Sequence, residues 1–360
     1  MSGPLEAAGP AGAAEVELAC AELGPALEFF VSRLGFRVET IFPAEEPSVA
    51  VLSGHGVRIR LGPNAVDPGR LRVPCRDPGA LGERVLVAPN GTRIELVQAD
   101  APFVMPPFRP EVLITRRSDG PQEGEGRAGM TYRDLIPGRL GGRYIASHIT
   151  IPEGGPVADW VHFHKVAFQL IFVRRGWVRV VYEDQGQPFV MQPGDCVVQP
   201  PRIRHRVLES SPGLEVIEVG CPALHETLAD HDMILPTGGV APDKDFSGQR
   251  FLRHVAAQTP WTPVDQAGWE ARETGVGQAT AGAAGARVLR PSAATRLDGA
   301  PHAGELLFGF VLEGEGRLDL GGVHPLGPAD AFVIPPGEPW GLDAASQDFQ
   351  ILEVTAPAAG

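Results

Sequence analysis

Apolar and polar residues alternate with a period of two along most of this 360-residue chain, which is typical of strands that bury one face. Clusters of glycine, proline, aspartate and asparagine separate the alternating runs. Many short strands with frequent turns favour a mainly β architecture of barrels or sandwiches. The strands that we predict are 16–20, 49–52, 57–61, 143–149, 170–173, 177–182, 196–199, 214–219, 308–312, 317–320 and 331–334.

Helical periodicity is clearest in residues 24–34. Leu27, Phe30, Val31 and Leu34 share one face there, and a glycine follows as a stop signal. We therefore predict one well-formed helix near the N-terminus.

A second, shorter helix is predicted near 224–230, where it would pack over the mouth of a barrel. Cys221, His225 and His231 in and around this segment superficially resemble a metal cluster. Their spacing matches no zinc signature, so the helix is the favoured interpretation.

Two polar, turn-rich segments predict linkers between domains. Residues 100–129 contain several prolines and then a glycine-rich polar run, and residues 236–249 have the same character. These linkers divide the chain into predicted domains at 1–100, 130–235 and 250–360.

Composition excludes several classes of protein. The 45 glycines and 36 prolines are about twice the average usage, but a hydrophobic fraction of 43% predicts a globular chain rather than a disordered one. A net charge of −13 disfavours binding to a phosphate backbone or an anionic membrane, so we expect neither nucleic-acid nor membrane partners. The sequence also lacks the long apolar run that a transmembrane helix requires.

The N-terminus and the cysteines indicate the compartment. Residues 1–15 lack the basic and apolar regions of a signal peptide and are interpreted as a short flexible leader. Cys20, Cys75, Cys196 and Cys221 are widely spaced and form no CxxC pair. These features predict a reduced, cytoplasmic protein without structural disulfides.

The last two predicted domains resemble each other. Residues 162–176 and 302–316 align without a gap, and each stretch runs from a histidine to a glycine with an apolar strand at the same offset. Further on, 192–205 and 326–340 both hold a glycine, an aspartate, a strand and a Pro-Pro pair. This repeat predicts two copies of one barrel.

Three histidines of the first copy predict a metal site. His162 and His164 stand at positions i and i+2 of a predicted strand, so both imidazoles point to one face. A neighbouring strand of the same barrel would bring His205 to the same point. Imidazoles gathered in this way are ligands for a divalent metal ion.

Residues 162–176 resemble the first motif of the cupin family. They reproduce its spacing as HxH-x4-Q-x6-G, with His162, His164 and Gln169 at the ligand positions. Gln169 replaces the usual carboxylate, so the resemblance implies three neutral imidazoles and at most one weak amide ligand. Gln169 would be either a direct ligand or a group that hydrogen-bonds a metal-bound water or the substrate.

Residues 192–205 resemble the second cupin motif through its glycine, its proline and His205. Arg202 replaces a family glycine, and it either reaches a substrate carboxylate or belongs to a solvated basic loop. The resemblance implies a mainly β bicupin with two cupin β-barrels, of which 130–235 binds the metal. The resemblance favours Fe(II), and the ligands themselves accept Mn, Ni, Cu and Zn as alternatives.

Residues 15–98 resemble the glyoxalase-like, vicinal-oxygen-chelate fold through the segments LGFRV and NGTRIELVQ. The family's metal positions map onto Glu15, Glu95, Arg60 and Arg70. Because an arginine has no lone pair for a metal, this small α+β domain is predicted to be structural or dimer-forming rather than a second active site. In the alternative, Arg60 and Arg70 hold a carboxylate.

The second copy, 250–360, lacks the ligand set and is predicted to be degenerate. His302 remains, but the gapless alignment places Gly304 at the second histidine and Gly309 at the glutamine. Trp340 stands near the place of the third histidine. A single imidazole cannot hold a catalytic metal, so we expect this barrel to bind none.

Cupins with three histidine ligands include dioxygenases, and bicupin ring-cleaving dioxygenases of the gentisate type have a similar size but a differently spelled metal motif. The resemblance therefore implies an Fe(II) dioxygenase that acts on a small carboxylated, phenolic or dicarbonyl molecule, with Gln169 and Arg202 as candidate catalytic residues. One alternative is a metal-dependent isomerase or lyase, in which His148 or Glu183 would move a proton. The other is a ligand-binding cupin without enzymatic activity, and a homodimer is one possible assembly.

Overall fold

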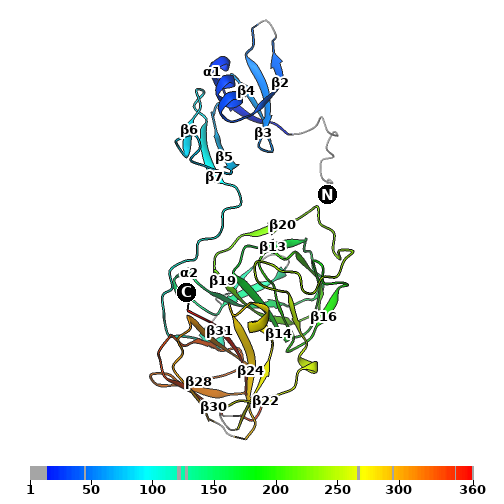
Figure 1. Cartoon of the computed structure of the whole chain (residues 1–360), viewed down its shortest axis with the longest axis vertical. Helices are drawn as coiled ribbons and strands as arrows, with labels where there is room; N and C mark the ends of the chain where they lie inside the picture. Colours follow the sequence, from blue (N-terminus) through cyan, green and yellow to red (C-terminus); the bar gives the residue numbers. More distant parts are fainter. Residues whose placement is uncertain are drawn as a thin grey trace. The chain divides into compact units, whose positions relative to one another are not determined.

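The computed structural model describes residues 14–43, 46–119, 123–125, 129–265, 268–293, 296–344 and 346–358 (Figure 1). The chain divides into two compact units, 1–102 and 103–360. Strands dominate both units, as the alternating pattern predicted. Residues 1–13 of the predicted leader and part of the linker at 100–129 lie outside the described residues.

The first unit is an α+β module built on a four-stranded sheet. The strand order is β1-β4-β3-β2, in which β1 runs parallel to β4 and the other pairs are antiparallel. Helix residues Ala26, Phe30 and Leu34 share a core with Leu52 and Ile59 of the sheet. The elements are β1 (Val16–Ala19), α1 (Leu23–Glu28), η1 (Phe29–Arg33), β2 (Arg37–Phe42), β3 (Val49–Gly54) and β4 (Val57–Gly62).

The helix predicted at 24–34 is confirmed, but its geometry changes along its length. An α-helical turn ends at Glu28, and a π-helical turn continues to Arg33. Phe30 is fully buried, whereas Val31 is 38% exposed. The wider π turn rotates Val31 away from the face that regular α-helical spacing predicts.

A three-stranded sheet completes the first unit. Its order is β5-β7-β6, with β5 parallel to β7. Its strands are β5 (Arg70–Cys75), β6 (Val85–Val87) and β7 (Arg93–Gln98). The Asn90 amide donates to the Ala19 carbonyl oxygen at 2.8 Å, which ties this sheet to the end of β1.

The second unit contains two β-sandwiches. In the first sandwich a seven-stranded sheet and a six-stranded sheet enclose one apolar interior. The large sheet runs β21 (Leu252–His254), β17 (Cys196–Val198), β14 (Phe168–Arg175), β19 (Leu214–Cys221), β11 (Ile145–Ile151), β10 (Thr131–Asp134) and β9 (Glu123–Glu125). The smaller sheet runs β16 (Phe189–Met191), β15 (Val178–Tyr182), β18 (His205–Ser210), β13 (His162–His164) and β20 (Thr227–Ala229), and β12 (Gly155–Pro156) pairs with β18.

The second sandwich repeats this arrangement, which confirms the predicted duplication. Its strands β24-β31-β26-β29 follow the order of β11-β19-β14-β17 in the first sandwich. The large sheet runs β22 (Thr262–Pro263), β23 (Trp269–Glu273), β24 (Gly285–Pro291), β31 (Gln350–Ala356), β26 (Leu306–Glu313), β29 (Ala331–Val333) and β8 (Leu113–Thr115). The smaller sheet runs β25 (Arg296–Gly299), β30 (Trp340–Ala344), β27 (Gly316–Asp319) and β28 (Val323–Leu326).

The two sandwiches exchange edge strands and share a core. β8 precedes the first sandwich in the chain but joins the large sheet of the second, where it pairs with β29. β21 lies in the chain between the two sandwiches and takes the equivalent edge of the first, where it pairs with β17. Buried side chains of both large sheets, such as Phe172 and Phe310, form one apolar cluster. Because each sandwich supplies part of the other's packing, we expect them to fold as one cooperative body.

Two expectations change in the structure. Residues 224–230 form no helix, because β20 pairs with the edge strand β13 and satisfies its backbone hydrogen bonds as a strand. The predicted barrels are pairs of facing sheets, and no closed barrel is found in the described residues.

Helical segments of the second unit are single turns. They are η2 (Arg117–Asp119), α2 (Arg139–Gly142), η4 (Ala256–Gln258) and α3 (Val276–Ala279). In the described part of the chain, no helix has the length and hydrophobicity needed to cross a bilayer.

A buried charge network lies where the two sandwiches meet. His148 Nε2 donates to Glu215 at 2.8 Å, and Arg174 donates to the same carboxylate and to the Leu312 carbonyl oxygen. The His148 ring also contacts Phe310, with ring centroids 5.6 Å apart. Burial opposes ionisation of Glu215, but the hydrogen bonds from His148 and Arg174 outweigh it and lower the pKa of Glu215 to about 2.

This network predicts that acid destabilises the protein. Burial lowers the pKa of His148 more than the contact with Glu215 raises it. Below pH 6.5 the unfolded chain therefore binds a proton at His148 more readily than the folded protein does. The low pKa of Glu215 adds stability that is present above pH 4.5 and is lost as the pH falls towards 2, up to about 3 kcal/mol. Denaturant unfolding between pH 3 and pH 8 measures both effects. A Glu215→Gln protein whose stability falls as steeply below pH 4.5 as that of the wild type would contradict this assignment.

Candidate metal centre

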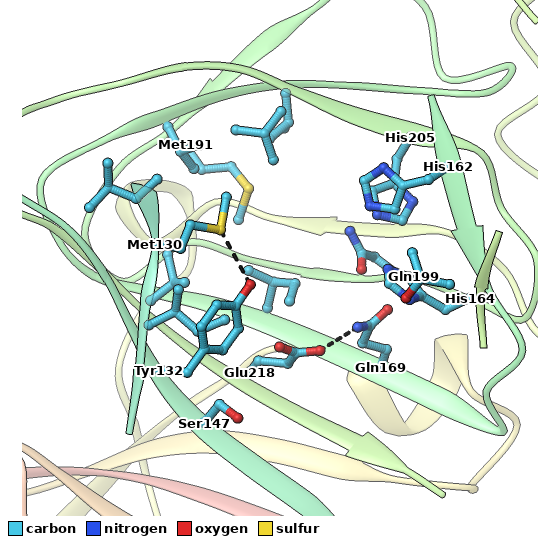
Figure 2. A pocket seen from close by; sticks show the side chains of 18 of the residues that line it. Met130, Tyr132, Ser147, His162, His164, Gln169, Met191, Gln199, His205 and Glu218 are labelled. Atoms are coloured by element: carbon cyan, nitrogen blue, oxygen red, sulfur yellow. Dashed lines mark hydrogen bonds between the residues drawn. The ribbon is translucent and has the colours of Figure 1, made fainter. Parts of the chain in front are cut away.

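Three histidines of the first sandwich meet at one end of its interior (Figure 2). β13 carries His162 and His164, and His205 begins β18 directly opposite His162 in the antiparallel register. One ligand nitrogen from each ring lies within 4.8 Å of the others, and the ring centroids are 4.2 to 5.3 Å apart. Among the described residues, these three side chains are the group placed closely enough to hold a metal ion.

Each imidazole is oriented through its Nδ1 atom. Nδ1 of His162 and Nδ1 of His205 each donate to the backbone carbonyl two residues earlier, at 2.8 and 3.0 Å. A carbonyl oxygen only accepts, so these Nδ1 atoms carry the protons and Nε2 holds the lone pair. Nδ1 of His164 bonds the Thr227 hydroxyl at 3.0 Å. Partners of this kind orient the histidines that ligate metals in proteins.

Gln169 lies beside the triad and is held by Glu218. Its Nε2 atom donates to Glu218 Oε1 at 2.5 Å. Its Oε1 atom is buried and accepts no hydrogen bond in the described structure. A buried acceptor without a partner is unusual, and this side chain lines the same cavity as the histidines. The donor set therefore fits a divalent ion, with three imidazoles and a neutral amide oxygen.

The triad opens into a cavity of about 280 Å³ inside the first sandwich. Figure 2 shows Met130, Tyr132 and Met191 at the end away from the histidines. Among the described residues that line it, Glu218 is the one carboxylate, and no lysine or arginine is present. The apolar lining consists of Met130, Ile145, Ile149, Ile151, Ile171, Val178, Val180, Met191, Val207, Leu214 and Val216. Such a space suits a small, largely apolar molecule.

Tyr182 and Gln199 form the wall beside His205. The Tyr182 ring stacks on His205 with centroids 5.5 Å apart, and Gln199 Nε2 donates to the Tyr182 hydroxyl oxygen at 2.8 Å. Burial raises the pKa of the Tyr182 hydroxyl, so this group stays protonated and neutral near pH 7. The wall fixes the position of His205 without adding charge.

Three other sequence candidates lie away from the cavity. Arg202 occupies a turn with φ 66°, its backbone N–H donates to the His164 carbonyl, and its side chain is not among the described lining residues. His148 belongs to the network between the sandwiches, and Glu183 binds Lys244 at 2.5 Å. The catalytic role of Arg202 stays a prediction, and the two proposed bases face other partners.

The sequence reasoning missed Glu218, and it named His225 only in a superficial cluster that it set aside. Glu218 lies on the same face of β19 as Leu214 and Val216, which also line the cavity. Strand parity could therefore have identified it as a charged residue on an inward face. His225 also lines the cavity, with its ring centroid 5.3 Å from that of His164. Its spacing from Cys221 and His231 did not point to this cavity, because the loop before β20 places it there.

The structure shifts the alignment of the two sandwiches by two residues. A β-bulge follows Val173 in β14, and the equivalent bulge follows Val311 in β26. The turn glycines beyond them are Gly176 and Gly314, with φ of 71° and 74°. Gly176 therefore corresponds to Gly314, not to Gly316 as the gapless alignment had it.

This register corrects the ligand positions of the second sandwich. Leu307, rather than Gly309, takes the place of Gln169, and His302 takes the place of the second histidine of the HFH strand. Gly304 therefore does not stand at a histidine position. His302 Nε2 bonds the Ile334 carbonyl oxygen at 2.8 Å.

Apolar side chains fill the interior of the second sandwich. Trp340 begins β30 as His205 begins β18, and it packs against this core. Leu307, Phe332 and Phe349 are buried in the same cluster. The space that holds the triad in the first sandwich is therefore packed with hydrocarbon in the second.

In the first unit, two of the mapped metal positions pair with each other. Arg60 Nε donates to Glu15 Oε2 at 2.6 Å, and Arg58 lies 3.2 Å from the same carboxylate. Arg70 is exposed on β5. The carboxylate that Arg60 binds is therefore one of the chain's own.

Comparison with known families matches the description "Cupin domain" to two segments, residues 147–219 and 289–355. These segments fall in the two sandwiches, so each copy of the duplicated unit is similar to a cupin domain. A search of curated proteins gave no match.

Solved structures share this fold at low sequence identity. Oxalate decarboxylase from Bacillus subtilis is 12% identical, with a TM-score of 0.51 over 71% of this chain and 77% of that chain. A mutant of salicylate 1,2-dioxygenase from Pseudoaminobacter salicylatoxidans is 18% identical, with a TM-score of 0.51 over 70% and 86%. Protein Ylba from E. coli is 12% identical, with a TM-score of 0.50 over 67% and 89%. Similarity at this level shows a bicupin-like fold and no more.

Proposed function

We propose that the first sandwich is the active site of an Fe(II)-dependent dioxygenase that acts on a small phenolic, dicarbonyl or carboxylated molecule. The observation that carries this proposal is the convergence of three imidazoles at the end of an apolar cavity. Salicylate 1,2-dioxygenase and oxalate decarboxylase, the latter with Mn(II) centres, share this fold, so the fold accommodates enzymes that act on small oxygenated molecules.

The chain's residues would divide the work. His162, His164 and His205 would hold the ion, and Gln169 would add its amide oxygen or hydrogen-bond a ligand of the ion. A bound Fe(II) ion supplies redox chemistry with dioxygen. The apolar lining excludes water from the reacting groups and orients the body of the substrate.

A metal-dependent isomerase or lyase is the second candidate, and Glu218 favours it. A carboxylate that lines the cavity could move a proton to or from a substrate whose carbonyl is polarised by a divalent ion. His148 and Glu183 have other partners, so Glu218 takes the role that was predicted for them.

Oxygen uptake separates the two candidates. The Fe(II)-loaded protein would be mixed with phenols, diketones and hydroxybenzoates, and oxygen consumption and product mass would be recorded. A dioxygenase consumes one O₂ per product and adds both oxygen atoms. Turnover under argon with no gain of oxygen would instead establish the isomerase or lyase.

Replacing Gln169 tests whether it contacts the ion. In a Gln169→Glu protein a second carboxylate would stand 2.5 Å from Glu218, where the amide now donates a hydrogen bond. We expect tighter Mn(II) binding at pH 8 than in the wild type, because the ion gains an anionic ligand. The gain should shrink by about tenfold at pH 6, since two adjacent carboxylates share a proton. Turnover should fall at both pH values.

The control is Gln169→Leu, the residue that the second sandwich carries as Leu307. It should weaken Mn(II) binding about tenfold. Because it adds no carboxylate, it should also lack the change in affinity gain between pH 8 and pH 6 that we expect for Gln169→Glu. Calorimetric titration measures all three proteins. Equal Mn(II) affinity in all of them would show that Gln169 lies outside the reach of the ion.

We also propose that the first unit is a glyoxalase-like module that assembles a homodimer and does not catalyse. Its sheet of order β1-β4-β3-β2, with β1 parallel to β4, supports the likeness, and the Glu15–Arg60 ion pair argues against a metal there. Removing residues 1–102 and measuring mass by light scattering tests the assembly role.

The four cysteines are all free, which supports a reducing, cytoplasmic location.

A further inference from the structure

Glu218 is placed where a substrate would meet it. It stands on β19 with its carboxylate in the cavity, between Gln169 and Tyr132 in Figure 2. Gln169 donates a hydrogen bond to this carboxylate, and the bond engages Oε1 alone. No lysine or arginine lines the cavity in the described residues, so the negative charge is not neutralised from within it.

The second sandwich shows what this position looks like without a cavity. Glu353 occupies the equivalent place on β31, opposite Arg287 of β24, and Arg287 Nε donates to its Oε1 at 2.7 Å. In the first sandwich the residue opposite Glu218 is Ser147, which cannot neutralise a carboxylate. The two copies therefore keep the acid, but only the second keeps a cationic partner for it.

A charge left facing an apolar cavity is costly unless a ligand satisfies it. We propose that Glu218 is a substrate-binding residue whose carboxylate accepts a hydrogen bond from a hydroxyl, amine or amide N–H of the substrate. The site would then select molecules that present a donor at this point over those that present a carboxylate. This inference rests on the proposed function only in taking the cavity as the substrate site, and it holds for either reaction.

The proposal narrows the substrate class. A carboxylate of the substrate finds no cationic side chain among the lining residues, so it could be held only at the metal end. A molecule that presents a donor group beside its metal-binding group would contact both the ion and Glu218. The apolar residues towards Met130 and Met191 would take the hydrocarbon part.

Salicylamide and salicylate test this selection, since they differ by an amide in place of a carboxylate. Their dissociation constants would be measured by calorimetry on full-length protein loaded with Zn(II), which is not redox active. The quantity of interest is the ratio of the two constants, compared between wild type and Glu218→Gln. Contacts with the ion are the same in both proteins and cancel from this comparison.

We expect the ratio to shift by about tenfold or more towards salicylate in Glu218→Gln, because the new amide can donate to a carboxylate and no longer repels it. Glu353→Gln is the matched control in the second sandwich and should leave the ratio as in the wild type. An unchanged ratio in a folded Glu218→Gln protein overturns the proposal.

The readout is independent of turnover. Absence of oxygen uptake would refute the proposed dioxygenase function but leave the ligand ratio of the Zn(II)-loaded protein measurable. A shifted ratio without turnover would therefore retain Glu218 as a selecting residue, and normal turnover with an unshifted ratio would remove it.

Discussion

A His205→Ala protein is expected to lose its metal ion and all turnover. His205 lies opposite His162 across two strands, and its Nε2 holds the lone pair that faces the other two imidazoles. Two histidines and an amide are a poor ligand set for a divalent ion, so we expect metal affinity to fall by more than about 100-fold. Metal content per chain, measured by mass spectrometry after gel filtration, reports the loss directly.

His302→Ala is the matched control for this experiment. His302 of the second sandwich takes the place of His164, and its Nε2 bonds a backbone carbonyl rather than facing other imidazoles. Its removal should leave metal content unchanged. Retention of a full equivalent of metal in His205→Ala, or loss of metal in His302→Ala, would place the ion elsewhere.

Glu305→Ala is expected to cause the largest loss of stability. The Arg143 guanidinium donates two hydrogen bonds to Glu305, at 2.7 and 2.9 Å, and the Tyr144 hydroxyl donates a third at 3.0 Å. Both charged side chains are about 90% buried, so alanine would leave an arginine without its counter-ion inside the protein. Removing one partner of a buried pair costs about 3–5 kcal/mol.

Thermal unfolding measures this cost. Asp243→Ala serves as the control, because it breaks the exposed pair with Arg250, and exposed pairs contribute less than about 1 kcal/mol. The ion pair of Arg143 and Glu305 joins the two sandwiches, which exchange edge strands and share a core. We therefore expect the whole of 103–360 to melt at a lower temperature in a single transition. A loss for Glu305→Ala no larger than that for Asp243→Ala would show that the Arg143 charge finds another partner.

Strand parity and motif spacing were enough to predict much of the metal centre. Two histidines at i and i+2 of a strand must share a face, whatever the rest of the fold does. The same rule, applied to LEVIEVG of β19, would have found Glu218. It was missed because a carboxylate on an alternating strand is normally interpreted as solvent-facing, and only the opposite sheet shows that this face is the interior.

The duplication was evident in the sequence, but its register was not. A gapless alignment treats every residue as one step along a strand, whereas the bulges in β14 and β26 show where the two copies truly correspond. When the two copies are aligned by their hydrogen-bonded neighbours, Leu307 takes the place of Gln169. With this two-residue correction an apolar side chain occupies the glutamine position, as expected for a packed core.

The sequence by itself determined several local facts: that its alternating runs form strands, which histidines share a face, and that the C-terminal two thirds repeat one unit. These follow from periodicity and covalent spacing, which act within one element. Tertiary structure alone decided the long-range facts. It exchanged β8 and β21 between the sandwiches, turned 224–230 into a strand, and left Glu218 opposite Ser147 where Glu353 faces Arg287. Partners from distant segments meet only after the sheets pack, so no local pattern encodes them.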